Sequence, residues 1–260
     1  MHGHERRAAI VDVTRKLGGY ASINDLAALT GVSPLTIRRD SEQLEAAGLV
    51  RRTRGAIRLV EGQGVTLEPT FLARNTINDS AKRAIARAAT ALVRPGSTIA
   101  IDTGTTTLAF SQVLPPLDDL TIVTSSLLVA TQTASAHEVH VLAGRVRPAE
   151  LSVVGAEAYA SALDRRLDQL FLGAAAVGEK VYDYSADDAY TKRALIGQAN
   201  EVILLCDASK FGAHAAATVC ELTTVTLLVT DHPPPAALAR RLDDAGVAIH
   251  LIGNPEETPT

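Results

Sequence analysis

The 260-residue sequence predicts an α/β protein in two parts, a small N-terminal domain made mainly of helices and a larger domain built on a parallel sheet. Three observations predict this division. Residues 1–60 contain ten Lys and Arg against six Asp and Glu, a balance of +4, whereas the rest of the chain contains 15 against 23, a balance of −8. A capped helix with two adjacent arginines lies in the basic segment. Seven short apolar runs, most of them separated by helical patterns, follow residue 79.

The composition is that of a packed globular protein. Hydrophobic residues make up 47% and charged residues 21% of the chain. Cys206 and Cys220 are too few for a disulfide framework and both lie in apolar surroundings, so we expect two small buried side chains. The polar N-terminus does not have the pattern of a signal peptide, and no apolar run is long enough to span a bilayer. We expect a cytoplasmic protein without a metal or a cofactor.

Three helices are predicted in the first 48 residues. Apolar residues at helical spacing predict a first helix that ends at Gly18–Gly19. A second helix is expected to begin at Ser22, because Asp25 stands three residues later as in a capping box. Gly31 supplies a turn. The third helix is expected to begin with Ser33 as its N-cap and Pro34 at its first position, and to stop at Gly48.

The third helix has a core face and a charged face. If Ile37 faces the core, the helical period of 100° per residue places Ser41 and Leu44 on the same side and Arg39 on the opposite side, with Arg38 on a flank. Arginine can bind guanine through two hydrogen bonds or grip a phosphate. We therefore expect the following side chains to meet DNA: Ser33, Thr36, Arg38 and Arg39.

A basic hairpin is predicted after the third helix. Residues 49–52 and 57–59 have the pattern of two short strands around Thr53-Arg54-Gly55-Ala56, and this wing would bring Arg52 and Arg54 to the DNA backbone. The alternative is an ordinary helical bundle with a solvated arginine pair. The ordered set of capped helices, glycine turn and basic hairpin favours the DNA-binding interpretation over that alternative.

This segment resembles the DeoR-type winged helix-turn-helix of bacterial sugar-metabolism repressors. The matching residues are Val32, Ser33, Thr36 to Asp40, Leu44, Gly48, Leu49 and Arg52. Two positions depart from the family pattern. Ser41 stands where the family usually has leucine, which predicts a less tightly packed helix, and Arg54-Gly55-Ala56 replaces the usual His-Gly-Gly of the wing. The extra arginine should raise the affinity for phosphate.

The rest of the chain is predicted as a linker and an α/β domain. Residues 61–78 carry glycines and a proline without a period and are expected to be a linker. The α/β domain is expected over 79–231, with residues 232–260 adding a helix, a strand and a tail. Continuous apolar strands indicate a largely parallel sheet. The expected strands are 98–101, 120–124, 139–142, 170–172, 202–205, 225–229 and 247–251.

The loop after the first of these strands has the residues of a ligand site. Ligands of such sheets bind beyond the carboxyl ends of the strands. Asp102 could accept hydrogen bonds from sugar hydroxyls, and Gly104 allows close approach of the backbone. The amides and hydroxyls of Thr105 and Thr106 at a helix start could bind a phosphate. The chain has neither a second Asp-Thr-Gly, as an aspartic protease needs, nor the further nucleotide motifs of a sugar kinase.

Other polar residues follow later strands. Arg145 and Arg147 come after the strand-like residues 139–143, and Asp188 and Lys192 are spaced to share a helix face. Lys210 follows residues 202–206. Each alone is most simply a surface charge, and Asp188 with Lys192 a surface pair. Together with the threonine loop, however, they could surround a small phosphorylated sugar.

This domain resembles the DeoR C-terminal sensor domain, which is related in fold to ribose-5-phosphate isomerase, glucosamine-6-phosphate deaminase and the CoA-transferase-like proteins. Matching stretches include Asp102 to Thr106, Phe171-Leu172-Gly173 and Lys192-Arg193. Ser125 and Ala143 replace residues that are usually Asn and Gly, which could change the effector preference. The resemblance places these residues in an effector pocket: Asp102, Gly104, Thr105, Thr106, Lys192 and Lys210. The charge pattern adds Arg145 and Asp188.

We therefore expect a DNA-binding transcriptional regulator, a repressor of a carbohydrate-metabolism operon whose affinity for its operator is controlled by a phosphorylated sugar. Its partners would be double-stranded operator DNA, the sugar phosphate and further copies of itself in a homodimer or homotetramer. The alternative is an enzyme, a sugar-phosphate isomerase or deaminase with a DNA-binding appendage. In that case Asp102, Asp188, Asp207, Lys192 and Lys210 could perform acid–base chemistry.

Overall fold

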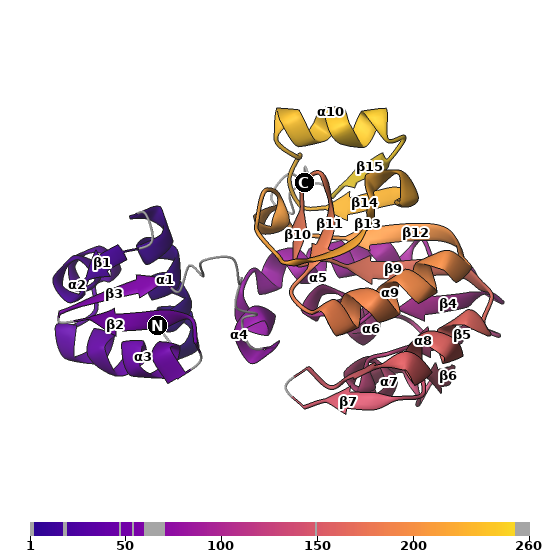
Figure 1. The fold of residues 1–260 in the computed structure, drawn as a ribbon, viewed down its shortest axis with the longest axis horizontal. Coiled ribbons are helices and arrows are strands. Elements are labelled where there is room, and N and C mark those ends of the chain that lie inside the picture. Colours follow the sequence, from indigo (N-terminus) through magenta and orange to yellow (C-terminus); the bar gives the residue numbers. More distant parts are fainter. Residues whose placement is uncertain are drawn as a thin grey trace, which may run out of the picture. The chain divides into compact units, whose positions relative to one another are not determined.

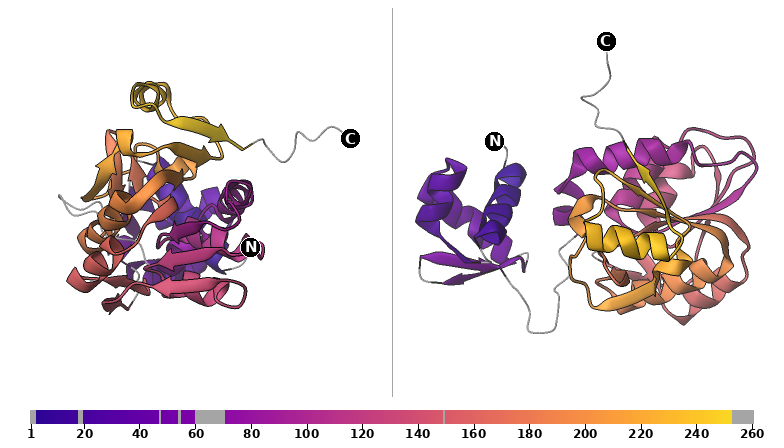
Figure 2. Two further views of the ribbon diagram at one scale, coloured as in Figure 1. Left: turned by 90° about the vertical axis from the view of Figure 1, so that its right-hand side faces the viewer. Right: turned by 90° about the horizontal axis from the view of Figure 1, so that it is seen from above.

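The computed structural model describes residues 3–17, 20–46, 48–53, 55–59, 71–148 and 150–252. The chain divides into two compact units, Met1–Ile77 and Asn78–Thr260, and each is described by itself (Figures 1 and 2). Predicted residues that lie outside the described ranges are Arg54, most of the linker from 61 to 70, and the tail from 253.

In the N-terminal unit, helices pack on a small antiparallel sheet (Figure 1). Helices α1 (Gly3–Lys16), α2 (Ile23–Thr30) and α3 (Pro34–Ala46) pack on strands β1 (Tyr20–Ser22), β2 (Val50–Thr53) and β3 (Ala56–Leu59). The strands are antiparallel in the order β1-β3-β2. The three helices and the hairpin lie where the sequence predicts them, and β1 adds a strand that the prediction lacked. A short helix α4 (Phe71–Thr76) lies within the predicted linker.

Local signals fix the ends of the helices in this unit. Ser22 accepts a hydrogen bond from the Asp25 amide at 3.0 Å and donates its hydroxyl to the Asp25 carboxylate at 2.7 Å, so the predicted cap is formed. Gly31 adopts a φ of 69°, a left-handed conformation that suits glycine, and ends α2. The core of the unit consists of buried aliphatic side chains from α1 to α3 and β1 to β3, chiefly Ile10, Leu26, Ile37, Leu44 and Ile57.

The larger unit is built on a seven-stranded parallel sheet in the order β15-β14-β12-β9-β4-β5-β6. Its strands are β4 (Thr98–Ile101), β5 (Thr121–Thr124), β6 (Glu138–Val141), β9 (Leu167–Gly173), β12 (Ala199–Leu205), β14 (Leu227–Thr230) and β15 (Ala248–Leu251). All seven overlap the predicted strands. From β4 the chain builds the sheet outward to β5 and β6, and from β9 it builds toward β12, β14 and β15. The direction in which the chain adds strands to the sheet therefore reverses between β4 and β9. Sheets of this kind bind ligands at such a reversal.

Helices connect the strands of the large sheet (Figure 1). They are α5 (Asp79–Thr90), α6 (Thr105–Val113), α7 (Leu127–Thr133), α8 (Ala156–Leu163), α9 (Ala186–Gln198) and α10 (Ala236–Asp244). Helices α5 and α6 pack side by side, as do α8 and α9, and both α6 and α9 contact the central strand β9. The inner strand positions are almost fully buried, as the continuous apolar runs predict.

Two further strand groups were not predicted. Strands β7 (Arg145–Arg147) and β8 (Ser152–Val154) form a hairpin, and β10 (Ala176–Val177), β11 (Lys180–Asp183) and β13 (Ala217–Glu221) form a small antiparallel sheet. Arg145 and Arg147 therefore lie on a strand of their own. Because these strands have only two to five residues, period-two alternation could not reveal them.

Candidate DNA-reading helix and effector pocket

Helix α3 presents a polar and cationic face, as predicted. Ser33 caps the helix, since its hydroxyl accepts from the Thr36 amide at 3.3 Å and shares a 2.9 Å hydrogen bond with the Thr36 hydroxyl. Arg38 and Arg39 are exposed and Thr36 is partly exposed. Within the part of the chain that the structure describes, neither arginine has an ion-pair partner. This helix can therefore offer two uncompensated cations to DNA.

The buried side of α3 contains two polar residues. Ser41 is fully buried, and its hydroxyl donates to the Ile37 carbonyl at 2.6 Å, so it takes a core position without leaving a polar group unpaired. Asp40, which the sequence analysis assigned to neither face, is also buried. It accepts two hydrogen bonds from the Arg6 guanidinium of α1, and Arg7 lies 3.7 Å away. This bidentate contact holds α3 against α1.

The wing carries exposed arginines in two different situations. Arg52 lies 3.2 Å from Glu42 and 3.8 Å from Glu45, so its charge is shared with the end of α3. Arg51 and Arg58 are both exposed and stand directly opposite each other on β2 and β3. Like charges in this arrangement repel, and an anion such as a DNA phosphate would relieve the repulsion. The wing thus presents Arg51 and Arg58 as well as the predicted Arg52.

In the larger unit, Asp102 lies between β4 and β9, where the strand order reverses. It follows β4 directly, and its Oδ2 accepts a hydrogen bond from the Gly173 amide at the end of β9, at 3.0 Å. Its side chain is fully buried, and its other oxygen, Oδ1, has no hydrogen-bond partner among the described residues. Burial raises the pKa of Asp102 to about 6, although the charge of Lys192 opposes that rise. An unpaired buried carboxylate oxygen is an acceptor that a ligand hydroxyl could satisfy.

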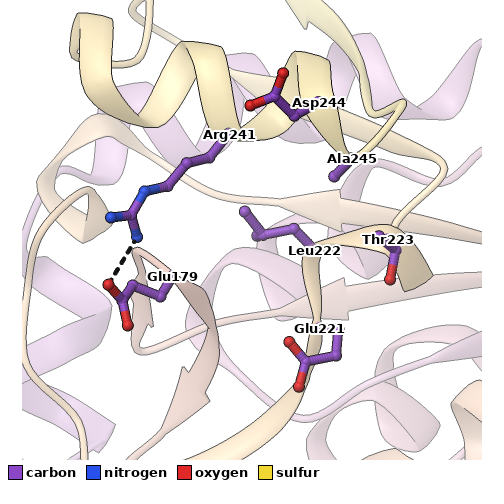
Figure 3. A pocket seen from close by; sticks show the side chains of 7 residues that line it. All are labelled: Glu179, Glu221, Leu222, Thr223, Arg241, Asp244 and Ala245. Carbon is purple, nitrogen blue, oxygen red and sulfur yellow. Dashed lines mark ion pairs between the residues drawn. The ribbon is translucent and has the colours of Figure 1, made fainter.

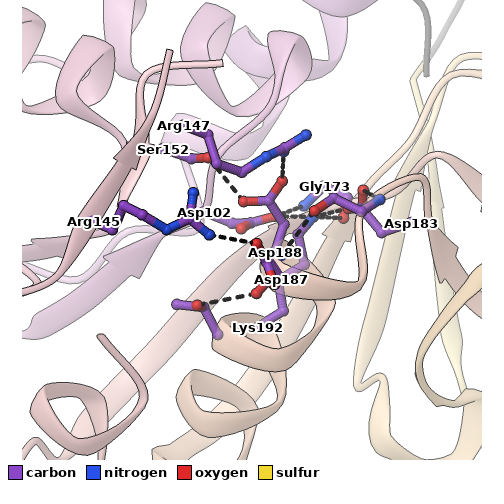
Figure 4. Close-up of polar contacts among 11 residues, drawn as sticks. Asp102, Arg145, Arg147, Ser152, Gly173, Asp183, Asp187, Asp188 and Lys192 are labelled. Atoms are coloured by element: carbon purple, nitrogen blue, oxygen red, sulfur yellow. Dashed lines mark hydrogen bonds and ion pairs between the residues drawn. The ribbon is translucent and has the colours of Figure 1, made fainter. Parts of the chain in front are cut away.

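Lys192 is anchored by three acceptors (Figure 4). Its Nζ lies 2.6 Å from Asp102 Oδ2 and 2.7 Å from Asp183 Oδ2, and it donates to the Gly173 carbonyl at 2.9 Å. An ammonium has three donors, so all of them are used inside the protein. Burial alone would lower the pKa of Lys192, but attraction by the two carboxylates outweighs burial and raises it, so the cation persists. Lys192 therefore ties α9 to β4, β9 and β11 and has no donor left for a phosphate.

Two arginines of β7 meet the start of α9 (Figure 4). Arg147 pairs with the buried Asp188, which also accepts from Ser152 at 2.8 Å, and Arg145 lies 2.8 Å from the exposed Asp187. Asp188 and Lys192 are both buried, so the interpretation of these two residues as a surface pair is wrong. They share a helix, yet each has its own partners. These partners could not be predicted from local patterns, because 42 residues separate Arg145 from Asp187 and 41 separate Arg147 from Asp188.

The threonine loop forms the start of α6. Gly104 adopts a φ of 149°, and a Cβ there would lie 3.3 Å from the Thr107 hydroxyl, so the position favours glycine. Thr105 and Thr106 are buried in the first turn of α6, where backbone amides have no partner within the helix. The loop therefore places amide donors next to Asp102, as an anion site requires.

Lys210 is separated from this cluster. It ends a short 3₁₀ helix (Ala208–Lys210) after β12, two strands from β4 in the sheet. Its neighbour Asp207 is buried and accepts from Asn78 at 2.8 Å and from Ser209, while Asp207 Oδ2 has no partner among the described residues. Lys210 lies at the same edge of the sheet as Asp102, but no direct contact joins the two.

A surface hollow of about 300 Å³ lies elsewhere, between α10 and the β11–β13 sheet (Figure 3). It is lined by three carboxylates, Glu179, Glu221 and Asp244, and Arg241 pairs with Glu179 at 3.1 Å. None of the predicted site residues lines it, and its charge does not suit an anion. Among the described residues, no helix is long and apolar enough to cross a membrane, and no group of three or more His, Cys, Asp or Glu side chains is arranged to hold a metal ion.

Comparison with known proteins identifies both units. The DeoR-like helix-turn-helix domain matches residues 6–63, and the DeoR C terminal sensor domain matches residues 77–232. The HTH-type transcriptional repressor CsqR of Escherichia coli (strain K12) is 32% identical over 238 residues, covering 90% of either chain. The Glycerol-3-phosphate regulon repressor of the same strain is 28% identical over 251 residues, covering 95% of this chain and 98% of the relative.

A third relative and a solved structure are also similar to this chain. The HTH-type transcriptional regulator GlpR of Haloferax volcanii is 30% identical over 248 residues, 94% of this chain and 96% of its own. Ribose 5-phosphate isomerase A of Methanocaldococcus jannaschii aligns with 52% of this chain and 55% of its own, at 20% identity and a TM-score of 0.39. The relatives that match nearly the whole chain are named as regulators, which favours a regulator over the isomerase or deaminase alternative. With both domains matched in order along the sequence, the chain belongs to the DeoR family of DNA-binding transcriptional regulators.

Proposed function

We propose that this regulator represses a carbohydrate-metabolism operon and that a phosphorylated sugar, bound at the end of β4, controls its affinity for the operator. The observation that carries the proposal is the Oδ1 atom of Asp102, a fully buried carboxylate oxygen without a partner among the described residues. A buried acceptor of this kind costs free energy unless it is satisfied. A sugar hydroxyl would satisfy it.

The surroundings of Asp102 suit the phosphate of the same ligand. The first amides of α6, at Thr105 and Thr106, point the positive end of a helix dipole toward that position. Lys210 adds positive charge after β12, whereas the charges of Arg145 and Arg147 on β7 are shared with Asp187 and Asp188. Lys192 acts indirectly in this scheme, because it holds Asp102 in place. The named relatives include a glycerol-3-phosphate regulon repressor, which agrees with a small phosphorylated ligand.

A thermal-shift panel tests the effector site. The purified full-length protein is heated with a series of sugar phosphates, with the same sugars without phosphate, and with inorganic phosphate. We expect at least one sugar phosphate to raise the unfolding temperature, because a ligand that binds only the folded state stabilises it. Asp102→Asn should abolish that rise, and Lys180→Met, an exposed lysine paired with Glu221, should retain it. A panel without any shift, or an unchanged shift in Asp102→Asn, would overturn the pocket.

Operator binding is tested separately. In a gel-shift assay with DNA from the promoter region of its own operon, Arg39→Ala should lose retention, whereas Arg240→Ala, which removes an exposed arginine of α10, should not. Affinity of the wild-type protein should fall steeply with salt, because phosphate contacts release counterions. Adding the sugar phosphate found in the panel should change retention. Equal retention by Arg39→Ala and wild type would remove α3 as the reading helix.

The protein is expected to act as a homodimer or homotetramer in the cytoplasm, where chromosomal operators lie. A single winged helix contacts few base pairs, so two copies that bind paired half-sites would reach a higher affinity for the operator than one copy. Light scattering of the purified protein measures the number of copies, and a monomer would contradict this part of the proposal.

A further inference from the structure

The face of α3 that carries Arg38 and Arg39 also carries a large apolar side chain. Leu35 lies in the first turn of the helix and is 63% exposed, whereas Leu44 of the same helix is buried in the core. Arg38 and Arg39 follow at spacings of three and four residues, so the three side chains share one face. The face therefore combines an apolar tip with two cations.

We propose that Leu35 contacts the 5-methyl group of a thymine in the operator and helps to select it. The inference rests on DNA binding by α3. The N-terminal residues of a recognition helix are those that reach base edges in the major groove. The thymine methyl is the one apolar group that base pairs display in that groove. A leucine at this place on the helix meets chemistry that only an A·T pair offers.

The charges around Leu35 favour DNA over an apolar protein partner. Arg38 and Arg39 have no ion-pair partner among the described residues, whereas Arg6 and Arg52 of the same unit are paired with acids. Burying two unpaired guanidinium groups in an apolar interface would be costly. Phosphates and guanine edges would satisfy them while Leu35 lies against the methyl group.

A second exposed leucine of the N-terminal unit provides a control for the substitution of Leu35. Leu29 of α2 is 61% exposed, almost as much as Leu35, but it does not lie on the cationic face of α3. Alanine has a high helix propensity, and both side chains are exposed, so neither Leu35→Ala nor Leu29→Ala should disturb the fold.

The test uses selected DNA. Wild type, Leu35→Ala and Leu29→Ala, each as the full chain, are used to enrich duplexes from a library with 20 randomised base pairs. In the duplex that wild type enriches, each thymine is then replaced singly by deoxyuridine, which removes only the methyl group. We expect one thymine per half-site whose replacement weakens wild-type binding about fourfold, the ratio that corresponds to burying one methyl group.

Comparison of the two variants tests whether Leu35 is the residue that contacts the thymine methyl group. Leu35→Ala should bind the thymine and deoxyuridine duplexes equally and should lose the preference for thymine at that position, while Leu29→Ala should keep both. A fourfold ratio that survives in Leu35→Ala, or a wild-type ratio near one at every thymine, would overturn this inference while leaving DNA binding intact. Failure of the wild-type protein to enrich any duplex would overturn DNA binding by α3 as well.

Discussion

Replacing Lys192 by methionine should destabilise the larger unit severely. Lys192 is almost fully buried, and its ammonium lies within 2.7 Å of two carboxylates, Asp102 and Asp183. Methionine has a similar volume but no charge. The variant would retain two buried carboxylates that face the same uncharged side chain.

The expected loss follows from the charges left behind. Two like charges about 5 Å apart repel by about 3 kcal/mol at an effective dielectric constant of ~20. Removing one partner of a buried ion pair typically costs about 3–5 kcal/mol. Since domains are stable by only about 5–15 kcal/mol, Lys192→Met should remove a large part of the stability of this unit.

Urea unfolding followed by far-UV circular dichroism measures this loss, since the chain contains no tryptophan. The matched control is Lys180→Met. Lys180 also pairs with a carboxylate, Glu221 at 2.5 Å, but both side chains are exposed, so the midpoint should change little. The loss of unfolding free energy in Lys192→Met should be smaller at pH 5 than at pH 7.5, because the carboxylates that have lost their partner can take up a proton at the lower pH. A midpoint equal to that of the control would refute the argument.

Two further predictions concern other buried carboxylates. The pKa of Asp102 is about 6 in the folded protein, above its ordinary 3.8, so the folded state takes up a proton first as the pH falls. Relative to Asp102→Asn, the wild-type protein should therefore gain about 1.4 kcal/mol of unfolding free energy between pH 7.5 and pH 5. Parallel pH profiles of the unfolding free energy of the two proteins would contradict this prediction. Asp40→Asn should weaken the contact of α3 with Arg6 and lower the stability of the N-terminal unit by about 1–3 kcal/mol, measured by urea unfolding, whereas Gln43→Ala on the exposed side should have little effect.

Local signals predicted most of the N-terminal unit. The caps at Ser22 and Ser33, the turn at Gly31 and the core positions of Ile37 and Leu44 depend on neighbours within a few residues, so the sequence contains them. The position of Asp40 could not be predicted in this way. An aspartate on a helix is usually exposed, and only the packing of α1, more than 30 residues away, supplies the arginines that permit its burial.

In the larger unit the sequence predicted the strands but not the partners across them. Apolar runs located all seven strands of the parallel sheet, and the strand-end rule located Asp102. The role of Lys192 as a buried anchor depends on Asp183, which lies on a four-residue strand whose antiparallel partners the periodicity did not reveal. Residue type alone could not distinguish a lysine that binds a ligand from one whose donors are already used.

The same geometry fits the proposal that this cluster of acids and a lysine binds a sugar phosphate without transforming it. Proton transfer by a lysine requires that it lose its proton, but Asp102 and Asp183 raise the pKa of Lys192 and occupy two of its donors. The third donor is bound to the Gly173 carbonyl. Among the described residues, the buried Oδ1 of Asp102 has no hydrogen-bond partner, and it belongs to a carboxylate that two strands and a helix hold in position. An acceptor fixed in this way discriminates ligands by their hydroxyl groups, which is the requirement of a sensor.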